Sequence, residues 1–412
     1  MTALGRLRDE APDEALERRA PGDVATVAGP APLPWLSALA VAGFVNAGNW
    51  KTSPLLSGVP FDLTLVLAAL VVAVVGWRII TDGIPFPVAV VVAGFSLLVP
   101  PLLWTVSSAY ADEKTLHLLT LTLLSALAPA VLVRTVEDAR RLLTGYAAIS
   151  LLTVVNVLVD PAPVATYRGA PLALPGVTTI AVGQSAAFVL LFAALAVIWK
   201  QRWSLLWAPP VAAAAILVML QTGSRGPLLS AGGAMVVTVA LLRPPLVRAG
   251  AVVGLVALAV TGLFARAPRY AQERIEQAAQ GQVTWDILLW VRLFQAAVRS
   301  VGRDPFGIGW GGYERIAPEG YRYPHNLALE LLTEAGVVFG GLFLAWVLLY
   351  YLWARRAGAC FTTSVLLAGF SFALLGSTTS GDVNDNRAMF MLLGASVAIV
   401  HRTRARDRAG PP

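Results

Sequence analysis

Residues 61–80 read FDLTLVLAALVVAVVGWRII, and this run decides the fold. Its two charged residues, Asp62 and Arg78, lie near its two ends. An α-helix rises roughly 1.5 Å per residue, so about 20 apolar residues are enough to cross the hydrocarbon core of a bilayer. The run therefore predicts a transmembrane helix.

The composition of the whole chain agrees with a membrane protein. Of 412 residues, 57% are hydrophobic and only 13% are charged, whereas soluble domains carry about 25% charged residues. The single cysteine, Cys360, excludes an internal disulfide framework and a multi-thiolate metal site. A net charge of +7 would suggest nucleic acid as the partner of a soluble protein. Here the net positive charge is explained by lysines and arginines in the loops between spans, and no nucleic-acid partner is predicted.

Similar apolar runs recur along the chain. They predict an all-α fold: a polytopic membrane protein with about 12 transmembrane helices and one large structured extracytoplasmic loop. The predicted spans lie near 33–49, 61–80, 84–106, 115–133, 142–160, 174–199, 204–221, 227–242, 246–265, 327–353, 360–376 and 388–401.

Charges in the loops predict the orientation of these spans. Lysines and arginines gather in alternate loops, which the positive-inside rule places in the cytoplasm. The chain is therefore expected in the bacterial inner (cytoplasmic) membrane, with both termini cytoplasmic. The predicted organisation is a disordered cytoplasmic tail over 1–32, helices 1–9 over 33–265, the extracytoplasmic loop over 266–326, helices 10–12 over 327–401 and a basic cytoplasmic tail over 402–412.

The long loop over 266–326 carries eight arginines and has helical patterning. Residues 269–280 predict a polar helix, and residues 284–301 predict an amphipathic helix with Thr284 as its cap. Arg292 and Arg299 fall on one face of the second helix at helical spacing. Such a helix can lie at the interface with membrane lipids.

His325 and Asn326 open the tenth predicted span, directly after the glycine-rich end of that loop. Asn326, Glu330 and Glu334 recur every four residues and form a polar stripe on an apolar helix. Ionisable groups in a span usually face a cavity and indicate function. The structural alternatives are a buried histidine and a salt bridge from the stripe to a loop arginine. The other two histidines, His117 and His401, are weaker candidates.

Two further polar segments are predicted on the same face as His325. The turn TGSRGP over 222–227 places Arg225 between two spans, where its fork of donors suits a phosphate. A plain hairpin near lipid headgroups is the alternative. Asp382 and Asp385 could hold a divalent ion, although a hydrogen-bonded loop explains them better. No metal site is predicted, because no histidines or cysteines have ligand spacing.

Three motifs together resemble the O-antigen ligase/polymerase superfamily of polytopic membrane glycosyltransferases. They are TGSRGP (222–227), DPFGIGWGGYE (304–314) and PHNLALELLTEAG (324–336), in that order. The resemblance implies transfer of a glycan from an undecaprenyl-diphosphate carrier to an acceptor hydroxyl at the extracytoplasmic face. It implies that His325 is catalytic and that Arg225 and a loop arginine hold the diphosphate. Arg292 is the closest match for that arginine, Arg266, Arg269 and Arg299 remain alternatives, and Ser224, Asn326 and Glu330 could support the site.

The predicted mechanism is a metal-independent, histidine-assisted single displacement without a cofactor. Arginines would stabilise the departing diphosphate, and a neutral histidine would accept the proton of the acceptor hydroxyl. The acceptor could be a glycan, a lipid or a protein. A glycan polymerase using the same donor is the nearest alternative. A secondary transporter of a small anion is a third interpretation, although its polar groups would gather near the midplane.

Overall fold

Helices form almost all the regular structure of the chain. The computed structural model describes residues 33–50, 61–159, 162–163, 172–173, 178–223, 225–242, 285–318, 320–379 and 381–409, with short pieces between 248 and 280. The predicted tail over 1–32, the polar helix over 269–280 and most of the span over 246–265 lie outside these residues. Residues Pro32–Pro412 form one compact unit, and the elements described below belong to it.

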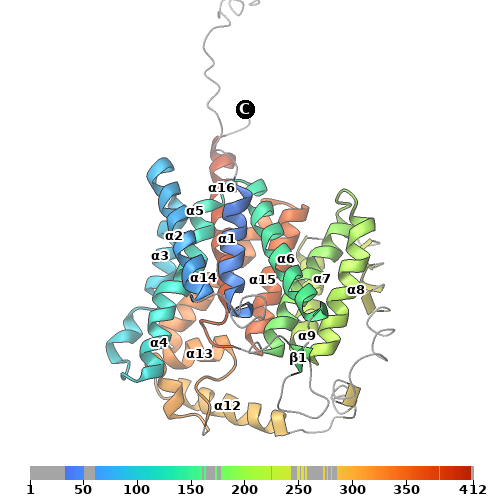
Figure 1. The fold of residues 1–412 in the computed structure, drawn as a ribbon. Coiled ribbons are helices and arrows are strands. Elements are labelled where there is room, and N and C mark those ends of the chain that lie inside the picture. Colours follow the sequence, from blue (N-terminus) through green and yellow to red (C-terminus); the bar gives the residue numbers. More distant parts are fainter. Residues whose placement is uncertain are drawn as a thin grey trace, which may run out of the picture. The chain divides into compact units, whose positions relative to one another are not determined.

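Most of the described α-helices overlap a predicted span, and short 3₁₀ or π turns join several of them (Figure 1). A pair of two-residue strands, β1 (Ala162–Pro163) and β2 (Leu172–Ala173), lies antiparallel. The helices are α1 (Trp35–Asn46), α2 (Leu63–Asp82), α3 (Phe86–Ser96), α4 (Ala109–His117), α5 (Leu123–Leu132), α6 (Val136–Val159), α7 (Thr179–Ile198), α8 (Ser204–Thr222), α9 (Arg225–Leu242), α12 (Trp285–Val301), α13 (Leu327–Glu334), α14 (Gly341–Ala354), α15 (Phe361–Ser377) and α16 (Arg387–Ala409).

Within the part of the chain that the structure describes, seven helical stretches are long and apolar enough to cross a membrane. Two shorter apolar helices, Gly226–Leu242 and Phe361–Ser377, accompany them. The seven stretches are Leu63–Asp82, Phe86–Trp104, Ala109–Leu132, Val136–Val159, Thr179–Ile198, Ser204–Thr222 and Gly336–Ala357.

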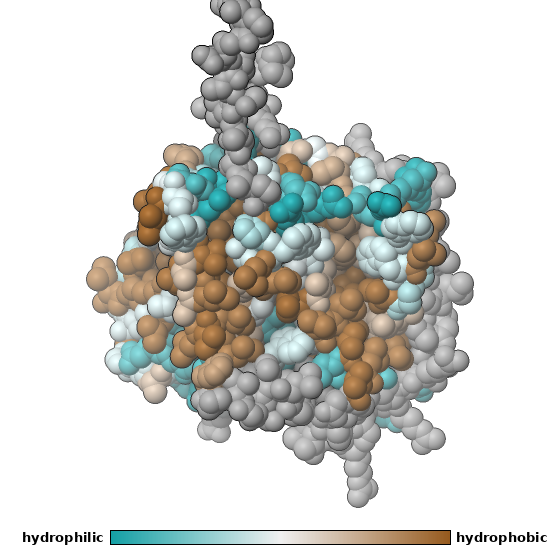
Figure 2. Space-filling model, turned by 45° about the horizontal axis from the view of Figure 1, so that its top comes forward, coloured by the Kyte–Doolittle hydropathy of each residue, from teal (hydrophilic) through white to brown (hydrophobic). Residues whose placement is uncertain are grey.

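The outer surface of these helices is apolar. On α2, for example, Leu65, Trp77 and Ile80 are more than half exposed. Figure 2 shows apolar side chains covering the flank of the helices below a row of hydrophilic side chains near the top. Exposed apolar surface of this extent is costly in water and is expected where lipid is the solvent.

The helices pack closely around α7, α15 and α16, whose side chains are largely buried. Helix α7 packs against α8 and α6, α15 packs against α9, and α16 packs against α5. At the contact of α16 and α5, a Cβ on Gly394 would overlap the Ala126 carbonyl. Small residues let helix backbones approach this closely in membrane proteins.

The predicted span over 327–353 is not one continuous helix. Helix α13 ends at Glu334, a π turn (η6, Gly336–Gly340) follows, and α14 begins at Gly341. The break has a local cause, because Gly336 has φ +78° and its backbone touches the chain at Phe306–Gly307. A side chain at Gly336 would overlap that backbone. The contact between Gly336 and the glycine-rich run over 304–314 therefore ends α13 after two turns.

Candidate functional site

The backbone at His325 is held in an unusual conformation. His325 has φ +53°, in the left-handed region, which costs a non-glycine residue of the order of 1 kcal/mol or more. Asn326 then caps α13: its Oδ1 accepts from Leu329 N (3.0 Å), and its Nδ2 donates to Thr378 O (3.0 Å). Strain that neighbouring contacts maintain often occurs at functional sites.

Three aromatic rings surround the His325 imidazole. Its ring centre lies 4.4 Å from that of Tyr323, 5.6 Å from Trp290 of α12 and 6.1 Å from Tyr321. Burial among these groups lowers the pKa of His325, and the negative charge of Asp382 opposes this in part. The imidazole is therefore neutral at neutral pH and can accept a proton.

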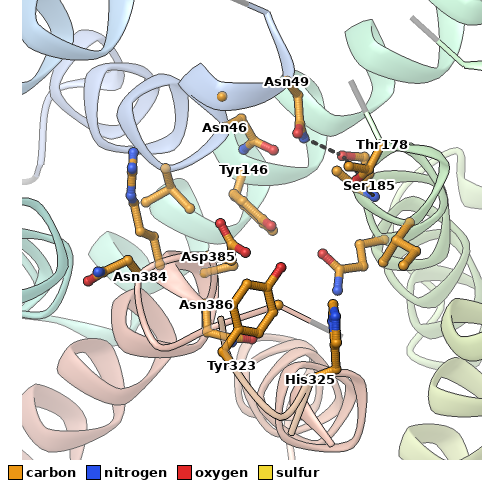
Figure 3. A pocket seen from close by; sticks show the side chains of 18 residues that line it. Asn46, Asn49, Tyr146, Thr178, Ser185, Tyr323, His325, Asn384, Asp385 and Asn386 are labelled. Carbon is orange, nitrogen blue, oxygen red and sulfur yellow. Dashed lines mark hydrogen bonds between the residues drawn. The ribbon is translucent and has the colours of Figure 1, made fainter. Parts of the chain in front are cut away.

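His325 lines a polar cavity of about 310 Å³. Figure 3 shows His325 and Tyr323 on one side of it, with side chains of the N-terminal region and of α7 opposite. The lining residues come from five parts of the chain: 45–49, Tyr146 of α6, 178–185, 323–325 and 381–388. The volume is at the lower end of the ~300–1,000 Å³ typical of small-molecule sites.

The loop before α16 and the first residue of α16 bring a carboxyl group and a guanidinium cation to this cavity. Asp385 and Arg387 both line it. Asp385 reaches solvent through the open cavity, while the protein around it and the neighbouring Asp382 raise its pKa to about 6. Asp382 shapes the loop, because its Oδ1 accepts from Asn384 N (2.8 Å) and Asp385 N (3.0 Å). Asp385 Oδ2 in turn accepts from Asp382 N (3.2 Å), so the hydrogen-bonded-loop interpretation describes both residues, and Asp385 also lines the cavity.

The Ser-Arg-Gly turn approaches the same place through its backbone. Helix α9 begins at Arg225, and a Cβ on Gly226 would lie 3.1 Å from Thr379 Oγ1. The preceding residue, Thr378, accepts the hydrogen bond from Asn326. Gly226, which follows Arg225, and Asn326, which follows His325, therefore contact neighbouring residues of one short segment. Ser224 lies outside the described residues.

Glu330 is directed away from the cavity, into a buried ionic cluster. Lys114 of α4 pairs with Glu330, and its Nζ lies 2.6 Å from Glu334 Oε2. All three side chains are buried. Glu334 also accepts from Tyr313 N (3.3 Å). The predicted salt bridge to a loop arginine is therefore a bridge to Lys114, and the supporting role expected of Glu330 in the site becomes a structural one.

The glycine-rich run DPFGIGWGGYE is tightly turned and packed on α13. Ile308 N donates to Thr333 O (3.0 Å), and Gly309 N donates to Glu334 O (3.0 Å). Trp310 is buried, and its Nε1 donates to Leu98 O (3.0 Å). These contacts fix the end of α13 that is opposite His325. The run is thus a clamp that orients the helix.

Helix α12 is the predicted amphipathic helix, and it carries the loop arginines. Its Leu293 and Ala297 pack against Tyr313, while Arg292 and Arg299 are exposed. Arg299 Nε donates to Gln295 O within the helix (3.1 Å). Neither arginine is among the described residues that line the cavity, and Arg269 and Arg266 lie outside the described residues. Within the described residues, Arg387 is the arginine that shares the cavity with His325.

Sequence reasoning missed Arg387 as a site residue, and the signal for it was weak. It follows an Asp-rich loop some 60 residues beyond His325, with no periodicity that points to a cavity.

The described residues hold no group of three His, Cys, Asp or Glu side chains suited to a metal ion. No protein-family model matches the chain, and a search of curated proteins finds no match.

Proposed function

We propose that this chain is a membrane glycosyltransferase of the O-antigen ligase type. It would move a glycan from an undecaprenyl-diphosphate carrier to an acceptor hydroxyl. The observation that supports this most is the grouping of His325 with Arg387 and Asp385 on one polar cavity. The approach of Gly226, next to Arg225, and of Asn326, next to His325, to the segment Thr378–Thr379 adds to that support.

The chemistry follows from these groups. The acceptor hydroxyl attacks the anomeric carbon and gives its proton to the neutral His325. The bond from that carbon to the phosphate oxygen breaks, and the diphosphate leaves with the electron pair. Because the leaving group is already anionic, it needs cations more than a proton. Arg387 is in place to supply one, and Arg225 is proposed to supply another.

The proposed topology has twelve spans, cytoplasmic termini and an extracytoplasmic loop over 266–326. The loop charges support it. In Figure 1, α12 and α13 lie at one end of the helices, and the C-terminal end of α16, with its basic residues, lies at the other. This arrangement supports the proposal that His325 lies on the extracytoplasmic face of the bacterial inner membrane.

Transfer by the purified protein tests this function. The protein would be reconstituted in nanodiscs with a radiolabelled undecaprenyl-diphosphate glycan and a pool of glycan, lipid and protein acceptors. We expect label on one acceptor class and no label with His325→Ala. A single transferred block indicates a ligase, and a ladder of products indicates a polymerase. Absence of transfer together with counterflow of a labelled anion in proteoliposomes would favour a transporter instead.

A further inference from the structure

The side chain of Asn384 ties the loop before α16 to α4 and to the π turn that follows α4 (η4, Leu118–Thr122). Asn384 Oδ1 accepts from Thr122 Oγ1 (2.8 Å), and Asn384 Nδ2 donates to Lys114 O (3.0 Å). Both Asn384 and Thr122 are buried. The oxygen and the nitrogen of this amide therefore each have a partner within the protein.

Asn384 is among the residues that line the cavity, but its amide is directed away from the space inside. Figure 3 shows the Asn384 amide pointing outward, whereas the Asp385 carboxylate points into the cavity. The backbone N–H groups of these two residues both donate to Asp382 Oδ1 (2.8 and 3.0 Å). Asp385 follows Asn384 directly and Arg387 follows two residues later, so a shift of Asn384 would displace both.

Lys114 connects this anchor to α13. Its carbonyl accepts from Asn384, while its Nζ lies 2.6 Å from Glu334 Oε2 of α13. Helix α13 begins two residues after His325. The helix that follows His325 and the loop that leads to Arg387 therefore meet at one residue of α4. The relative positions of these two cavity groups are thus set from outside the cavity.

The π turn contains two threonines whose hydroxyls have different partners. The Thr120 side chain is exposed, and its hydroxyl donates to Leu116 O within the helix (2.5 Å). This is the usual bond of a helical threonine, to a carbonyl four residues earlier. The Thr122 hydroxyl instead donates across to Asn384. Single π turns within α-helices occur frequently at functional sites, and here the turn supplies the donor that holds the loop.

We propose that Asn384 is a positioning residue that holds Asp385 and Arg387 at the cavity, with Thr122 as the partner that fixes its amide. Anchoring of the loop does not depend on the proposed function, whereas an effect on glycan transfer rests on it. Without the Thr122 hydroxyl, the Asn384 oxygen is buried without this donor, which favours a shifted loop. A displaced guanidinium stabilises the leaving diphosphate less in the transition state, so kcat should fall while KM stays the same.

Two matched variants of the full chain in nanodiscs test this role. Thr122→Val removes the donor at nearly constant shape, and Thr120→Val makes the same change in the same turn. Hydrogen exchange of the peptide over 381–388, measured by mass spectrometry, reports on the loop without any substrate. Initial rates over a range of donor concentrations give KM and the kcat per folded molecule. For Thr122→Val we expect faster exchange and a kcat lowered about 10–100-fold at unchanged KM. Thr120→Val should behave like the wild type.

A conservative variant separates the hydrogen bond from packing. Thr122→Ser restores the hydroxyl and should recover both the exchange rate and kcat. If Thr122→Val does not fold, Thr122→Ala removes the same hydroxyl with less bulk and should show the same two changes. Wild-type exchange in the folded variant, or faster exchange with wild-type kcat, overturns the positioning role. A wild-type protein that transfers no glycan overturns the proposed function alone, because hydrogen exchange still tests the anchor.

Discussion

Two groups of ionisable residues lie near α13, and they differ in their access to solvent. Lys114, Glu330 and Glu334 are buried, paired and closed to solvent. His325, Asp385 and Arg387 line an open cavity. The first group holds the helix against α4, and the second faces space that a ligand can enter. Glu330 and Glu334 of the polar stripe thus pair with Lys114, whereas His325, which precedes the stripe, lines the cavity.

The largest expected effect comes from breaking the buried cluster. Lys114→Met leaves two carboxylates buried without a counter-charge, which should lower the free energy of unfolding by about 3–5 kcal/mol. Fluorescence-detected size exclusion after heating would measure the loss. Lys200→Met changes an exposed lysine and should have no comparable effect. Adding Glu330→Gln and Glu334→Gln to Lys114→Met should restore much of the loss. Equal stability of the two single variants would show that the cluster is not structural.

The next effect concerns the cavity and leaves the fold intact. Arg387→Gln removes the cation beside His325, and transfer should fall about 10²–10³-fold, as when one preorganised donor is lost. Arg292→Gln, on the exposed face of α12, should reduce transfer much less. Initial rates at saturating acceptor, normalised to folded protein, measure both. A larger loss of transfer with Arg292→Gln would indicate that Arg292 of α12, and not Arg387, binds the diphosphate.

A smaller effect tests the glycine-rich clamp that fixes α13. Gly307 and Gly320 both have positive φ, at +83° and +85°. A Cβ at Gly307 would overlap the Glu334 carbonyl, whereas a Cβ at Gly320 would meet nothing within 4 Å. Gly307→Ala should therefore cost about 1–3 kcal/mol more than Gly320→Ala. Thermal unfolding of both variants measures the difference, and identical curves would mean that the clamp is loose.

The smallest effect is the pH dependence of transfer. Burial lowers the pKa of His325, so the imidazole gains a proton only below its ordinary value of 6.5. Transfer should be constant around neutral pH and decline as the pH falls through that lowered pKa. Asp382, Asp385, Arg387 and Tyr323 are the charged or titratable groups nearby, and Asp385, with a pKa of about 6, titrates in the same range. The Asp385→Asn variant should still lose transfer activity at low pH. If its activity does not fall at low pH, the pH dependence comes from Asp385 and not from His325.

Much of the fold could be predicted because a transmembrane helix is encoded by a local run of apolar residues. The apolar run over 61–80 became α2, and the amphipathic pattern over 284–301 became α12. Even the cap of α13 follows from Asn326 before an apolar run. Among the described residues, seven helical stretches are long and apolar enough to span a membrane. The break after Glu334 could not be predicted, because it depends on contact between Gly336 and the distant Phe306–Gly307 backbone.

The site was harder to predict because its members are far apart in the chain. Glu330 suggested function by its spacing, yet its partner Lys114 lies more than 200 residues earlier, and no sequence pattern links them. Asp382 and Asp385 form the hydrogen-bonded loop that was expected of them, but the sequence did not show that Asp385 and Arg387 also line a cavity. Only the packing of α1, α7 and the loop before α16 shows which polar side chains share a cavity.

One measurement tests most directly whether His325 acts in transfer and Glu330 only in stability. It compares transfer from the undecaprenyl-diphosphate glycan by His325→Gln and by Glu330→Gln. Both changes keep a polar side chain of similar size, and Glu330→Gln leaves Lys114 paired with Glu334. We predict a loss of about 10²–10⁴-fold for His325→Gln, as expected when a proton acceptor is removed, and near wild-type transfer per folded molecule for Glu330→Gln. Retained transfer by His325→Gln with loss by Glu330→Gln would contradict the account.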